Sequence, residues 1–314
     1  MRVACTVPSF GAHRVLRAEL LAAYPDAKIA APGQYLGEDE LIEWLADCDA
    51  VIGGKDTPVT ERMLDALPRL KVISNFGVGT DQHDFALLQR RGIRFGYTPG
   101  VNKRSVAELA LCFAISGLRG ISEMNAAMRA AERPRHNLGR LLTGRVVGIH
   151  GCGHIGKDFA QLLAPFGCTI LACDIKDYGG FYREHGITPV GFDELIERSE
   201  VISLHLPVTP LTRNLYNRET LKRLRPRCLL INTCRGYIVD EAALRDLLID
   251  GTLFAACFDA FVEEPATDDR LLGLRNFLST PHIGASAEES RLAMGRASIR
   301  GLSENAVPDP RDFP

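Results

Sequence analysis

The sequence predicts an α/β protein with two domains, each built on a parallel β-sheet that helices cover. Short apolar, β-branched runs alternate with amphipathic segments along most of the chain, as in parallel strands joined by crossover helices. A glycine-rich turn near the middle joins one such run to a helix. The length of 314 residues, 46% of them hydrophobic, is enough for two separate cores.

The bulk composition excludes several classes of protein. A net charge of −2 gives no basis for binding nucleic acid or an anionic membrane. No apolar run is long enough to span a membrane, and the N-terminus lacks the apolar centre of a signal peptide. The nine cysteines form no C-x-x-C pair, which predicts reduced thiols in a cytoplasmic protein, without disulfides and without a zinc or other metal site.

The first 100 residues alternate short apolar runs with helical segments and carry no glycine fingerprint. This pattern predicts a first parallel sheet, which we expect to form one side of a ligand-binding cleft. Strands are expected at 2–6, 50–53, 71–74 and 93–96, and helices at 12–23, 38–46, 60–66 and 85–91.

Two loops of this region stand out. The segment NFGVGTD, residues 75–81, follows a strand directly and therefore lies at the carboxyl edge of the sheet, where open α/β folds bind ligands. The amides of Val78 and Gly79 could hold a carboxylate there, and a plain strand-to-helix turn is an equally good interpretation. Residues 98–101, TPGV, are typical of a crossing between domains.

The next segments lead into the second domain. Ser105 and Glu108 have capping-box spacing and open an apolar helix to residue 118, which we interpret as the connector between the domains. Residues 124–145 are more polar and contain the run RPRH at 133–136. A solvated arm is the favoured interpretation, and the alternative is an arm that lends cations to the site of a neighbouring subunit.

The stretch RVVGIHGCGHIGKDFAQLLAPFGCTILACD, residues 145–174, organises the second domain. It reads as a strand, a G-x-G-x-x-G turn, a helix closed by a glycine, and a second strand followed by an acid. These parts fall at residues 145–149, 151–156, 155–166 and 169–174. A glycine fingerprint alone is a weak signal, but this order of parts predicts a dinucleotide-binding unit of the Rossmann type.

Each glycine of the turn has a separate role. Gly151 permits the tight turn, Gly153 lets the backbone approach a pyrophosphate, and Gly156 lets the helix pack closely on the strand. The N–H groups at the start of the helix favour the bound anion. We therefore expect the whole turn, including His154 and Ile155, to bind the cofactor.

Asp174 bears on the choice of cofactor. It lies where an acid grips the ribose hydroxyls of NAD, and its charge would repel the 2′-phosphate of NADP. NAD is therefore the predicted cofactor, although Lys176 is near enough in sequence to weaken the preference.

The alternation of strands and helices continues to the end of the chain. With the first two strands of this domain, the later runs make about six parallel strands of a doubly wound sheet. The last helix is expected to cross back to the first domain. Strands are expected at 201–204, 228–232, 255–258 and 277–280, and helices at 192–198, 218–224, 241–249 and 287–306.

Three polar residues follow the ends of later strands and could carry chemistry. Redox chemistry on an α-hydroxy acid needs a cation for the carboxylate, an acid–base group and a group that orients it. Arg235 can bind a carboxylate bidentately, His282 is the natural acid–base group, and Glu264 can hold its tautomer. A surface arginine and a structural histidine are the alternatives, and His205 also follows a strand but sits between two leucines.

Taken together, these motifs resemble those of the D-2-hydroxyacid dehydrogenase family over nearly the whole chain. The fingerprint GCGHIG at 151–156, with Asp174, is one of them. The others are NFGVGTD at 75–81, TPGVNKRSVAE at 98–108, SLHLPVTPLT at 203–212, INTCRGYIVDEAAL at 231–244, FDAFVEEP at 258–265 and TPHIGAS at 280–286.

The resemblance implies a role for each matched position. It implies that the amides of Val78 and Gly79 hold the substrate carboxylate and that Arg235 binds the carboxylate and the carbonyl oxygen. It implies that His282, paired with Glu264, donates the proton in reduction and removes it in oxidation, while hydride passes between substrate C2 and nicotinamide C4. Further cofactor contacts are implied for Pro207, Thr233, Cys234, Asp259 and Gly284, with Asp259 at the nicotinamide carboxamide.

The resemblance also implies the organisation of the molecule. A smaller, flavodoxin-like α/β substrate domain is expected at residues 1–100 and 287–314, and the NAD-binding Rossmann domain at 101–286. The expected ligand is a small 2-hydroxy or 2-keto acid, and the expected assembly is a homodimer held mostly through the cofactor domains.

The substrate within this class stays open. The motifs TPHIGAS and NKRSVAE resemble the phosphoglycerate dehydrogenase branch, in which Lys55, Lys103 or a neighbour's Arg133 or Arg135 would bind the phosphate of D-3-phosphoglycerate. Asn75 stands where that branch often has a basic residue, and ISNFGVGTD is more similar to glyoxylate and hydroxypyruvate reductases. An unusual small anion is a further alternative. A different class is an NADH-sensing regulatory protein, since the family resembles a group of transcriptional corepressors.

Overall fold

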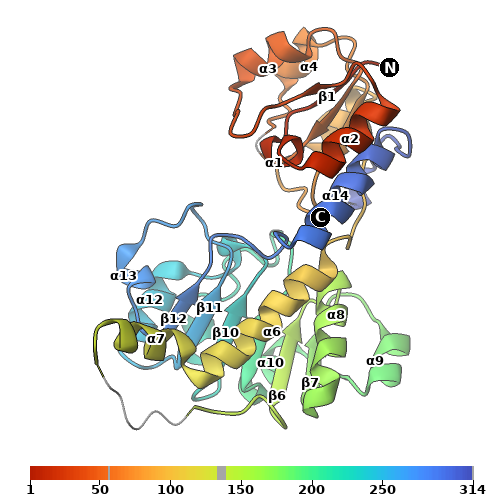
Figure 1. Ribbon diagram of the computed structural model, residues 1–314. Helices are drawn as coiled ribbons and strands as arrows, with labels where there is room; N and C mark the ends of the chain where they lie inside the picture. The colour runs from red at the N-terminus through yellow and green to blue at the C-terminus, as the bar shows by residue number, and fades with distance from the viewer. Residues whose placement is uncertain (56, 133–138, 313–314) are drawn as a thin grey trace. The chain divides into compact units, whose positions relative to one another are not determined.

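The computed structural model describes residues 1–55, 57–132 and 139–312. They form two compact units (Figure 1), one of Met1–Asn102 with the segment from Ser286 onward, the other of Lys103–Ala285. Each unit has its own parallel sheet with helices on both faces, which confirms the predicted α/β class. The RPRH run at 133–136 lies outside the described residues.

The first unit contains a five-stranded parallel sheet in the order β2-β1-β3-β4-β5, which is the flavodoxin-like order. Three of its strands are buried along their whole length, as expected for a sheet covered on both faces. The sequence pattern missed β2, a half-buried strand of two residues. The strands are Val3–Cys5 (β1), Lys28–Ile29 (β2), Ala50–Gly53 (β3), Val72–Asn75 (β4) and Arg94–Gly96 (β5).

The helices of this unit include one from the far end of the chain. Helix α14 packs on α2, β4 and β5. Ser74 Oγ donates a hydrogen bond to the carbonyl oxygen of Ser298 over 2.7 Å, and a Cβ on Gly96 would lie only 2.4 Å from the carbonyl oxygen of Gly301. The helices are Pro8–Gly11 (α1, which the pattern missed), Arg14–Ala23 (α2), Glu38–Leu45 (α3), Glu61–Ala66 (α4), Phe85–Arg90 (α5) and Glu288–Gly301 (α14).

The second unit contains a seven-stranded parallel sheet in the order β12-β11-β10-β9-β6-β7-β8. Counted along the chain, the first six of these strands, β6 to β11, have the doubly wound Rossmann order 3-2-1-4-5-6. The expectation of about six strands missed β8, an exposed strand of two residues that ends in proline. The strands are Val146–His150 (β6), Thr169–Cys173 (β7), Thr188–Pro189 (β8), Val201–Leu204 (β9), Leu229–Asn232 (β10), Ala255–Phe258 (β11) and Phe277–Ser279 (β12).

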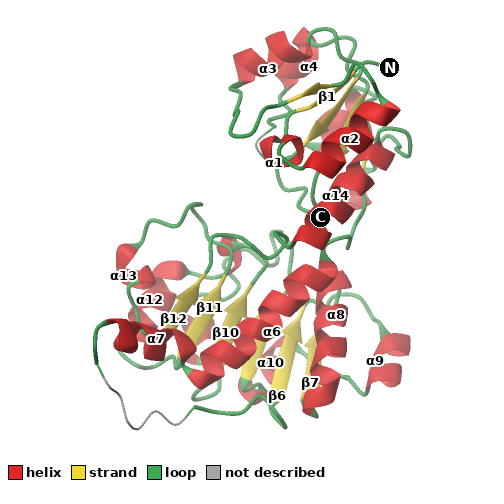
Figure 2. Ribbon diagram, in the orientation of Figure 1, coloured by secondary structure: helices red, strands yellow, loops and turns green. Residues whose placement is uncertain are grey.

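Helices cover both faces of this sheet (Figure 2), and each face has its own apolar cluster. Leu229 and Ile231 of β10 pack into one cluster, and Leu230 packs into the other, because side chains alternate along a strand. The helices are Lys103–Arg119 (α6), Ile121–Arg129 (α7), His154–Leu163 (α8), Gly179–His185 (α9), Phe192–Arg198 (α10), Arg218–Lys222 (α11), Glu241–Ile249 (α12) and Asp269–Leu272 (α13).

The segment from residue 124, expected as a solvated arm, begins within helix α7. Gly120, with a φ of +60°, ends α6 and starts α7 at a bend of 64°. The polarity that suggested an arm belongs to the exposed side of α7, whose one buried residue is Ala127. No described helix is by itself long and apolar enough to cross a membrane; only the bent pair of α6 and α7, taken together, has sufficient length and composition.

Candidate active site

The glycine turn between β6 and α8 contains two glycines that the protein's own packing requires. Gly151 has a φ of +92°, and a Cβ there would lie 2.4 Å from the carbonyl oxygen of His205. A Cβ on Gly156 would lie 2.1 Å from the carbonyl oxygen of Gly151. A Cβ on Gly153 would meet nothing within 4 Å, so packing within the described chain does not explain this glycine.

The start of α8 offers a site for an anion. Gly153 is the N-cap, and among the described residues no side chain caps the helix and no acid lies in its first turn. His154 is exposed and Ile155 half-buried. The unpaired N–H groups and the helix dipole favour negative charge here, so the residues present fit a pyrophosphate.

Asp174 directly follows β7, and its carboxylate lies against the glycine turn. Its Oδ2 accepts a hydrogen bond from the amide of Cys152 over 2.6 Å, and its Oδ1 accepts one from the amide of Lys176 over 2.8 Å. A carboxylate has about four acceptor positions, so two stay open for ribose hydroxyls. The turn, the helix start and this acid therefore fit NAD as a set.

The residues expected to carry the chemistry follow three neighbouring strands. Arg235 comes after β10, Asp259 directly after β11 and His282 shortly after β12, and these strands are adjacent in the sheet. Because the strands are parallel, their carboxyl ends meet at one edge, where open α/β sheets bind ligands. Glu264 lies on the loop that leaves β11.

The structure pairs His282 with Glu264. Nδ1 of the histidine lies 2.7 Å from Oε1 and 2.8 Å from Oε2 of the carboxylate. Since the carboxylate accepts, Nδ1 carries the proton and Nε2 faces away from the pair, available to a substrate oxygen. The side chains are 38% and 25% exposed, so a ligand can reach them.

His282 has a strained backbone, with a φ of +55°. The left-handed region costs a non-glycine residue about 1 kcal/mol or more and persists where surrounding contacts impose it. Those contacts come from Asp259, which is 1% exposed. Its Oδ1 accepts from Thr280 Oγ1 at 2.5 Å and from the Ile283 amide at 2.7 Å, and its Oδ2 accepts from the Gly284 amide at 2.7 Å.

The Asp259 carboxylate therefore accepts hydrogen bonds from the loop on both sides of His282. Three of its roughly four acceptor positions are taken by the loop, and the contact with the nicotinamide carboxamide that the resemblance implies stays a prediction. Gly284 belongs to the same arrangement: a Cβ there would lie 3.0 Å from Asp259 Oδ2, and its carbonyl oxygen accepts a hydrogen bond from Ser105 Oγ over 2.6 Å.

The turn that carries Arg235 is held by Asn232, which sequence reasoning missed. Asn232 is fully buried; its Nδ2 donates to the carbonyl oxygen of Arg235 over 2.9 Å, and its Oδ1 accepts from the amide of Cys234 over 3.1 Å. Arg235 is half-buried, and its Nη1 donates to the carbonyl oxygen of Cys234 over 2.7 Å. Thr233 Oγ1 is buried and has no partner among the described residues, as expected of a hydroxyl that awaits a ligand.

Pro207 and Gly236 lie in two further loops of the second unit. Pro207 is exposed in the loop after β9, where its carbonyl oxygen accepts a hydrogen bond from Thr212 Oγ1 over 2.6 Å. Gly236, not singled out from the sequence, packs so tightly on the loop after β11 that a Cβ would lie 2.0 Å from the carbonyl carbon of Phe261. Among the described residues, no three metal-ligating side chains gather.

The predicted substrate-binding residues lie in the first unit. Lys55 is exposed in the loop after β3, and Val78 and Gly79 are half-buried in the loop after the neighbouring strand β4. Asn75, the last residue of β4, is 4% exposed, and its Nδ2 donates to the carbonyl oxygens of Gly77 and Gly79, each over 3.0 Å. The one sequence signal for these contacts is a polar residue that closes an apolar strand.

Comparisons with known proteins show the family to which the chain is similar. The model of the family "D-isomer specific 2-hydroxyacid dehydrogenase, NAD binding domain" matches residues 111–284. The hydroxypyruvate reductase of Thermotoga maritima is 33% identical over 85% of this chain and 88% of its own length. The D-3-phosphoglycerate dehydrogenase of Mycobacterium tuberculosis is 35% identical over 86% of this chain, which spans about half (52%) of that relative.

A solved structure resembles the whole fold. The D-lactate dehydrogenase of Aquifex aeolicus, complexed with NAD and lactic acid, has a TM-score of 0.83, with 25% identity over 96% of this chain and 94% of that one. The chain therefore belongs to the D-isomer specific 2-hydroxyacid dehydrogenase family and is an NAD-dependent oxidoreductase that acts on a CH–OH group.

Proposed function

We propose that this enzyme reduces a short, unphosphorylated 2-keto acid, such as glyoxylate or hydroxypyruvate, to the D-2-hydroxy acid, and catalyses the reverse reaction. The observation that carries this proposal is the His282–Glu264 pair at the same sheet edge as Arg235. An acid–base group, its orienting carboxylate and a permanent cation are what this reaction needs from the protein.

The proposed roles follow from chemistry. Arg235 holds the carboxylate and carbonyl oxygen of the substrate, and the amides of Val78 and Gly79 bind the carboxylate. NADH, when bound, supplies the hydride that adds to C2. His282 Nε2 gives its proton to the carbonyl oxygen, so that keto acid, hydride and proton yield the hydroxy acid. Glu264 keeps the Nδ1 proton in place and stabilises the imidazolium, which is the form that donates the Nε2 proton in the reduction and the form that results when Nε2 takes the proton in the oxidation.

The substrate class is supported by the residue that opens the loop after β4. Asn75 is uncharged and buried, and both of its amide protons are used within the loop, so it offers no charge to a phosphate. The hydroxypyruvate reductase of Thermotoga maritima also matches along most of its length. D-3-phosphoglycerate is the second candidate, favoured by the 35% identity to the M. tuberculosis enzyme and by Lys55.

A panel of substrates tests the proposal. NADH oxidation is measured with glyoxylate, hydroxypyruvate, pyruvate and 3-phosphohydroxypyruvate, with His282→Ala as the inactive control. The highest kcat/KM is expected for one of the unphosphorylated acids. A preference for 3-phosphohydroxypyruvate would overturn the proposed substrate class. No turnover with any acid, together with tight NADH binding, would instead support an enzyme of an unusual small anion or an NADH sensor.

Asp174 is proposed to set the preference for NAD over NADP. Replacing it with alanine removes the acceptor for the ribose hydroxyls and the charge that repels a 2′-phosphate, and a charged hydrogen bond contributes about 1.5–3 kcal/mol. The ratio of kcat/KM with NADH to that with NADPH is expected to fall at least about tenfold. Lys176→Ala, which removes the charge that weakens the preference, is expected to move the ratio in the opposite direction, and an unchanged ratio in Asp174→Ala would contradict the ribose contact.

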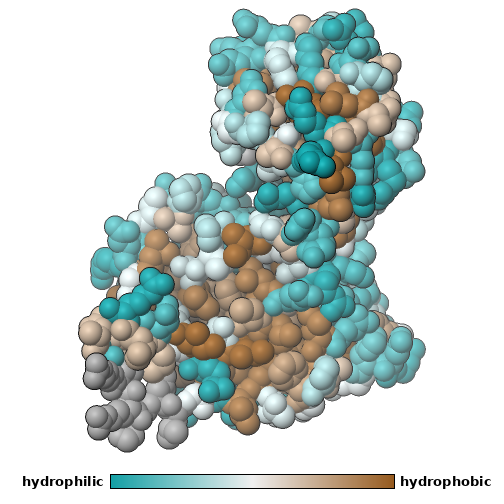
Figure 3. All heavy atoms as spheres, in the orientation of Figure 1, coloured by the Kyte–Doolittle hydropathy of each residue, from teal (hydrophilic) through white to brown (hydrophobic). Residues whose placement is uncertain are grey.

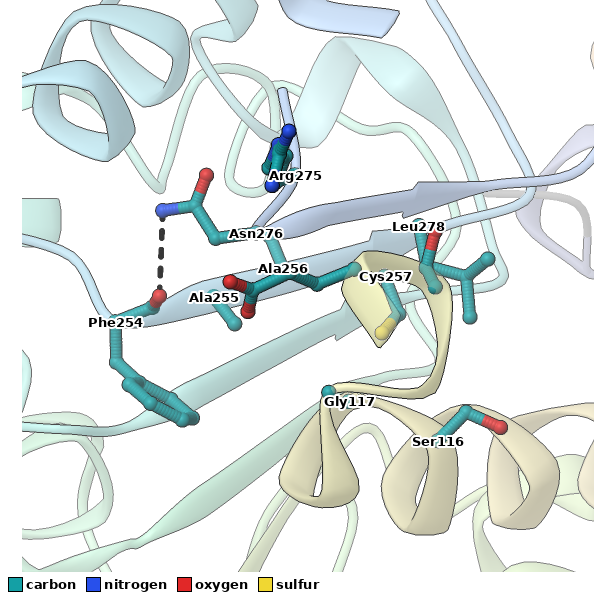
Figure 4. A pocket seen from close by; sticks show the side chains of 12 residues that line it. Ser116, Gly117, Phe254, Ala255, Ala256, Cys257, Arg275, Asn276 and Leu278 are labelled. Carbon is teal, nitrogen blue, oxygen red and sulfur yellow. Dashed lines mark hydrogen bonds between the residues drawn. The ribbon is translucent and has the colours of Figure 1, made fainter. Parts of the chain in front are cut away.

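We further propose that a second copy of the chain covers α6. From Leu109 to Leu118 this helix carries no charged residue, and Cys112 is exposed. Figure 3 shows hydrophobic residues gathered on the face of the second unit that carries α6. A pocket beside α6 is lined by Gly117 of this helix together with Cys257 and Leu278 (Figure 4). An apolar patch of this kind is typical of an interface.

A charge on this face tests the homodimer. Cys112→Glu is expected to convert a particle of twice the 34.4 kDa chain mass to the single chain, because the carboxylate would be buried at the interface. Val15→Glu, at an exposed apolar position on α2, is the matched control. Light scattering after gel filtration gives the mass, and a single-chain mass for the unsubstituted protein would refute the dimer.

The buried thiols suit a cytoplasmic enzyme. Burial raises the pKa of the Cys5 and Cys228 thiols to about 12, which keeps them protonated, and a reducing compartment preserves such thiols. We therefore place the enzyme in the cytoplasm, and fractionation of cells that produce it would show whether it is found there.

A further inference from the structure

We propose that Asn75 and Tyr97 are positioning residues that turn the amides of Val78 and Gly79 toward the substrate carboxylate. The inference rests on the proposed function and explains how the loop after β4 performs its part in it. Neither side chain needs to touch the substrate for this role, because each acts through a backbone peptide group.

The geometry of the peptide bond carries the argument. In a planar trans peptide, the C=O of one residue and the N–H of the next point in opposite directions. Asn75 Nδ2 donates to the carbonyl oxygen of Gly77 over 3.0 Å, so the N–H of Val78 points away from Asn75. Tyr97 Oη donates to the carbonyl oxygen of Val78 over 3.2 Å, so the N–H of Gly79 points away from Tyr97.

Both peptides are therefore fixed with their carbonyl groups toward the protein. No described residue accepts a hydrogen bond from the amide of Val78 or Gly79, which leaves both amides to a ligand. Gly77 permits this arrangement, since its φ of +121° is one that side chains disfavour. Successive N–H groups of this kind bind anions such as carboxylates.

The side chain of Asn75 is itself held in place by His83 and Gln82. Its Oδ1 lies 3.2 Å from Nε2 of His83 and 3.3 Å from Nε2 of Gln82. Because Oδ1 can only accept, Gln82 donates to it in either tautomer of His83, and His83 donates as well in the tautomer with a proton on Nε2; in the other tautomer Nε2 accepts from Gln82 Nε2, 3.0 Å away. The His83 ring packs edge-on against Phe95, and burial lowers its pKa to about 4, so the ring stays neutral at the pH of an assay.

This arrangement bears on the substrate class. The amide of Asn75 is committed to two carbonyl groups and a histidine, so the loop presents backbone N–H groups and no added charge from this position. Two amides match the two oxygens of a carboxylate. The loop is therefore built to orient the 2-keto acid by its carboxylate, whatever group follows C2.

Asn75→Asp is the decisive variant, because it keeps the shape of the side chain but replaces the two donated protons with an acceptor. The carboxylate would repel the carbonyl groups of Gly77 and Gly79 and release the loop. The KM for the 2-keto acid is expected to rise at least about tenfold, the size of a lost charged hydrogen bond, with kcat changed less than about threefold. The Kd of NADH, bound by the other unit, is expected to stay the same.

Two further variants separate positioning from folding. Tyr97→Phe removes one hydroxyl and is expected to raise KM about threefold to tenfold without the risk of misfolding. Ser74→Ala is the matched control: it removes a buried hydrogen bond from the neighbouring residue of β4, to Ser298, and is expected to lower the unfolding temperature without raising KM. Trp44, the only tryptophan, reports unfolding of this unit by its fluorescence.

The outcomes are distinguishable. An unsubstituted enzyme that turns over no 2-keto acid would overturn the proposed function and this inference with it. Turnover in the unsubstituted enzyme, with unchanged KM in both Asn75→Asp and Tyr97→Phe, would overturn the positioning role alone. A rise in KM of the same size in Ser74→Ala would also overturn it, because general loosening of the unit would then explain the effect.

Discussion

Replacing His282 with alanine is expected to lower kcat at least about 10²-fold while leaving the Kd of NADH unchanged. The variant loses the group that donates a proton to the carbonyl oxygen and removes it from the alcohol. General acid–base catalysis contributes about 10²–10⁴-fold to enzymatic rates, so the loss is expected within that range. The residues that fit NAD, at the glycine turn and Asp174, belong to other loops and stay intact.

The strained backbone of His282 offers a second explanation for a loss of activity in the alanine variant. Alanine at a φ of +55° is strained, so the loop between Thr280 and Gly284 could shift and disturb activity indirectly. His282→Asn avoids this objection, because asparagine tolerates the left-handed region better than most residues and cannot transfer the proton. Both variants are therefore expected to lose kcat to a similar extent.

Two further variants test the role of the carboxylate and supply a control: Glu264→Gln and His185→Ala. Glu264→Gln keeps an acceptor for Nδ1 but loses the charge that stabilises the imidazolium, so a smaller loss of kcat is expected than for His282→Ala. His185, on α9 of the same unit, is a histidine outside the proposed machinery, and its alanine variant is expected to keep full activity. Steady-state kinetics and NADH titration give both quantities; full turnover in His282→Ala would remove this residue from the mechanism.

The sequence predicts the parts of this enzyme that depend on local pattern. The apolar runs β9 and β11, the helices α10 and α12 and the order of strand, glycine turn, helix and acid are all visible in it, because burial on both faces and close packing at glycine restrict the residue types locally. The short edge strands β2 and β8 escaped prediction, because two residues carry no period.

Contacts between distant segments were harder to predict. Nothing in the sequence around Asp259 shows that this residue also holds the loop of His282, more than twenty residues later. Asn75 and Tyr97 meet at one loop because β4 and β5 are neighbouring strands, a fact of topology rather than of pattern. The types of these residues could be read from the sequence, but their partners could not.

A substitution in the glycine turn is expected to weaken cofactor binding without lowering the stability of the fold. Gly153→Ala is expected to weaken NADH binding about 30-fold, the equivalent of about 2 kcal/mol for an added group in a tightly packed contact. The new methyl group would stand where the backbone must approach the pyrophosphate. Among the residues that the structure describes it would meet no atom within 4 Å, so the free energy of unfolding is expected to change by less than about 1 kcal/mol.

Two other glycines supply the comparison. Gly191 is the N-cap of α10 in the same unit, has the same φ of −72° as Gly153 and also has open space around its Cβ position, so Gly191→Ala should leave both stability and NADH binding intact. Gly156→Ala should lose stability as well as NADH, because its Cβ would lie 2.1 Å from the carbonyl oxygen of Gly151. Calorimetric titration with NADH and thermal unfolding measure the two properties. If Gly153→Ala bound NADH as tightly as Gly191→Ala does, the second glycine of the fingerprint would have no role in approaching the cofactor, and the placement of the pyrophosphate at the start of α8 would be wrong.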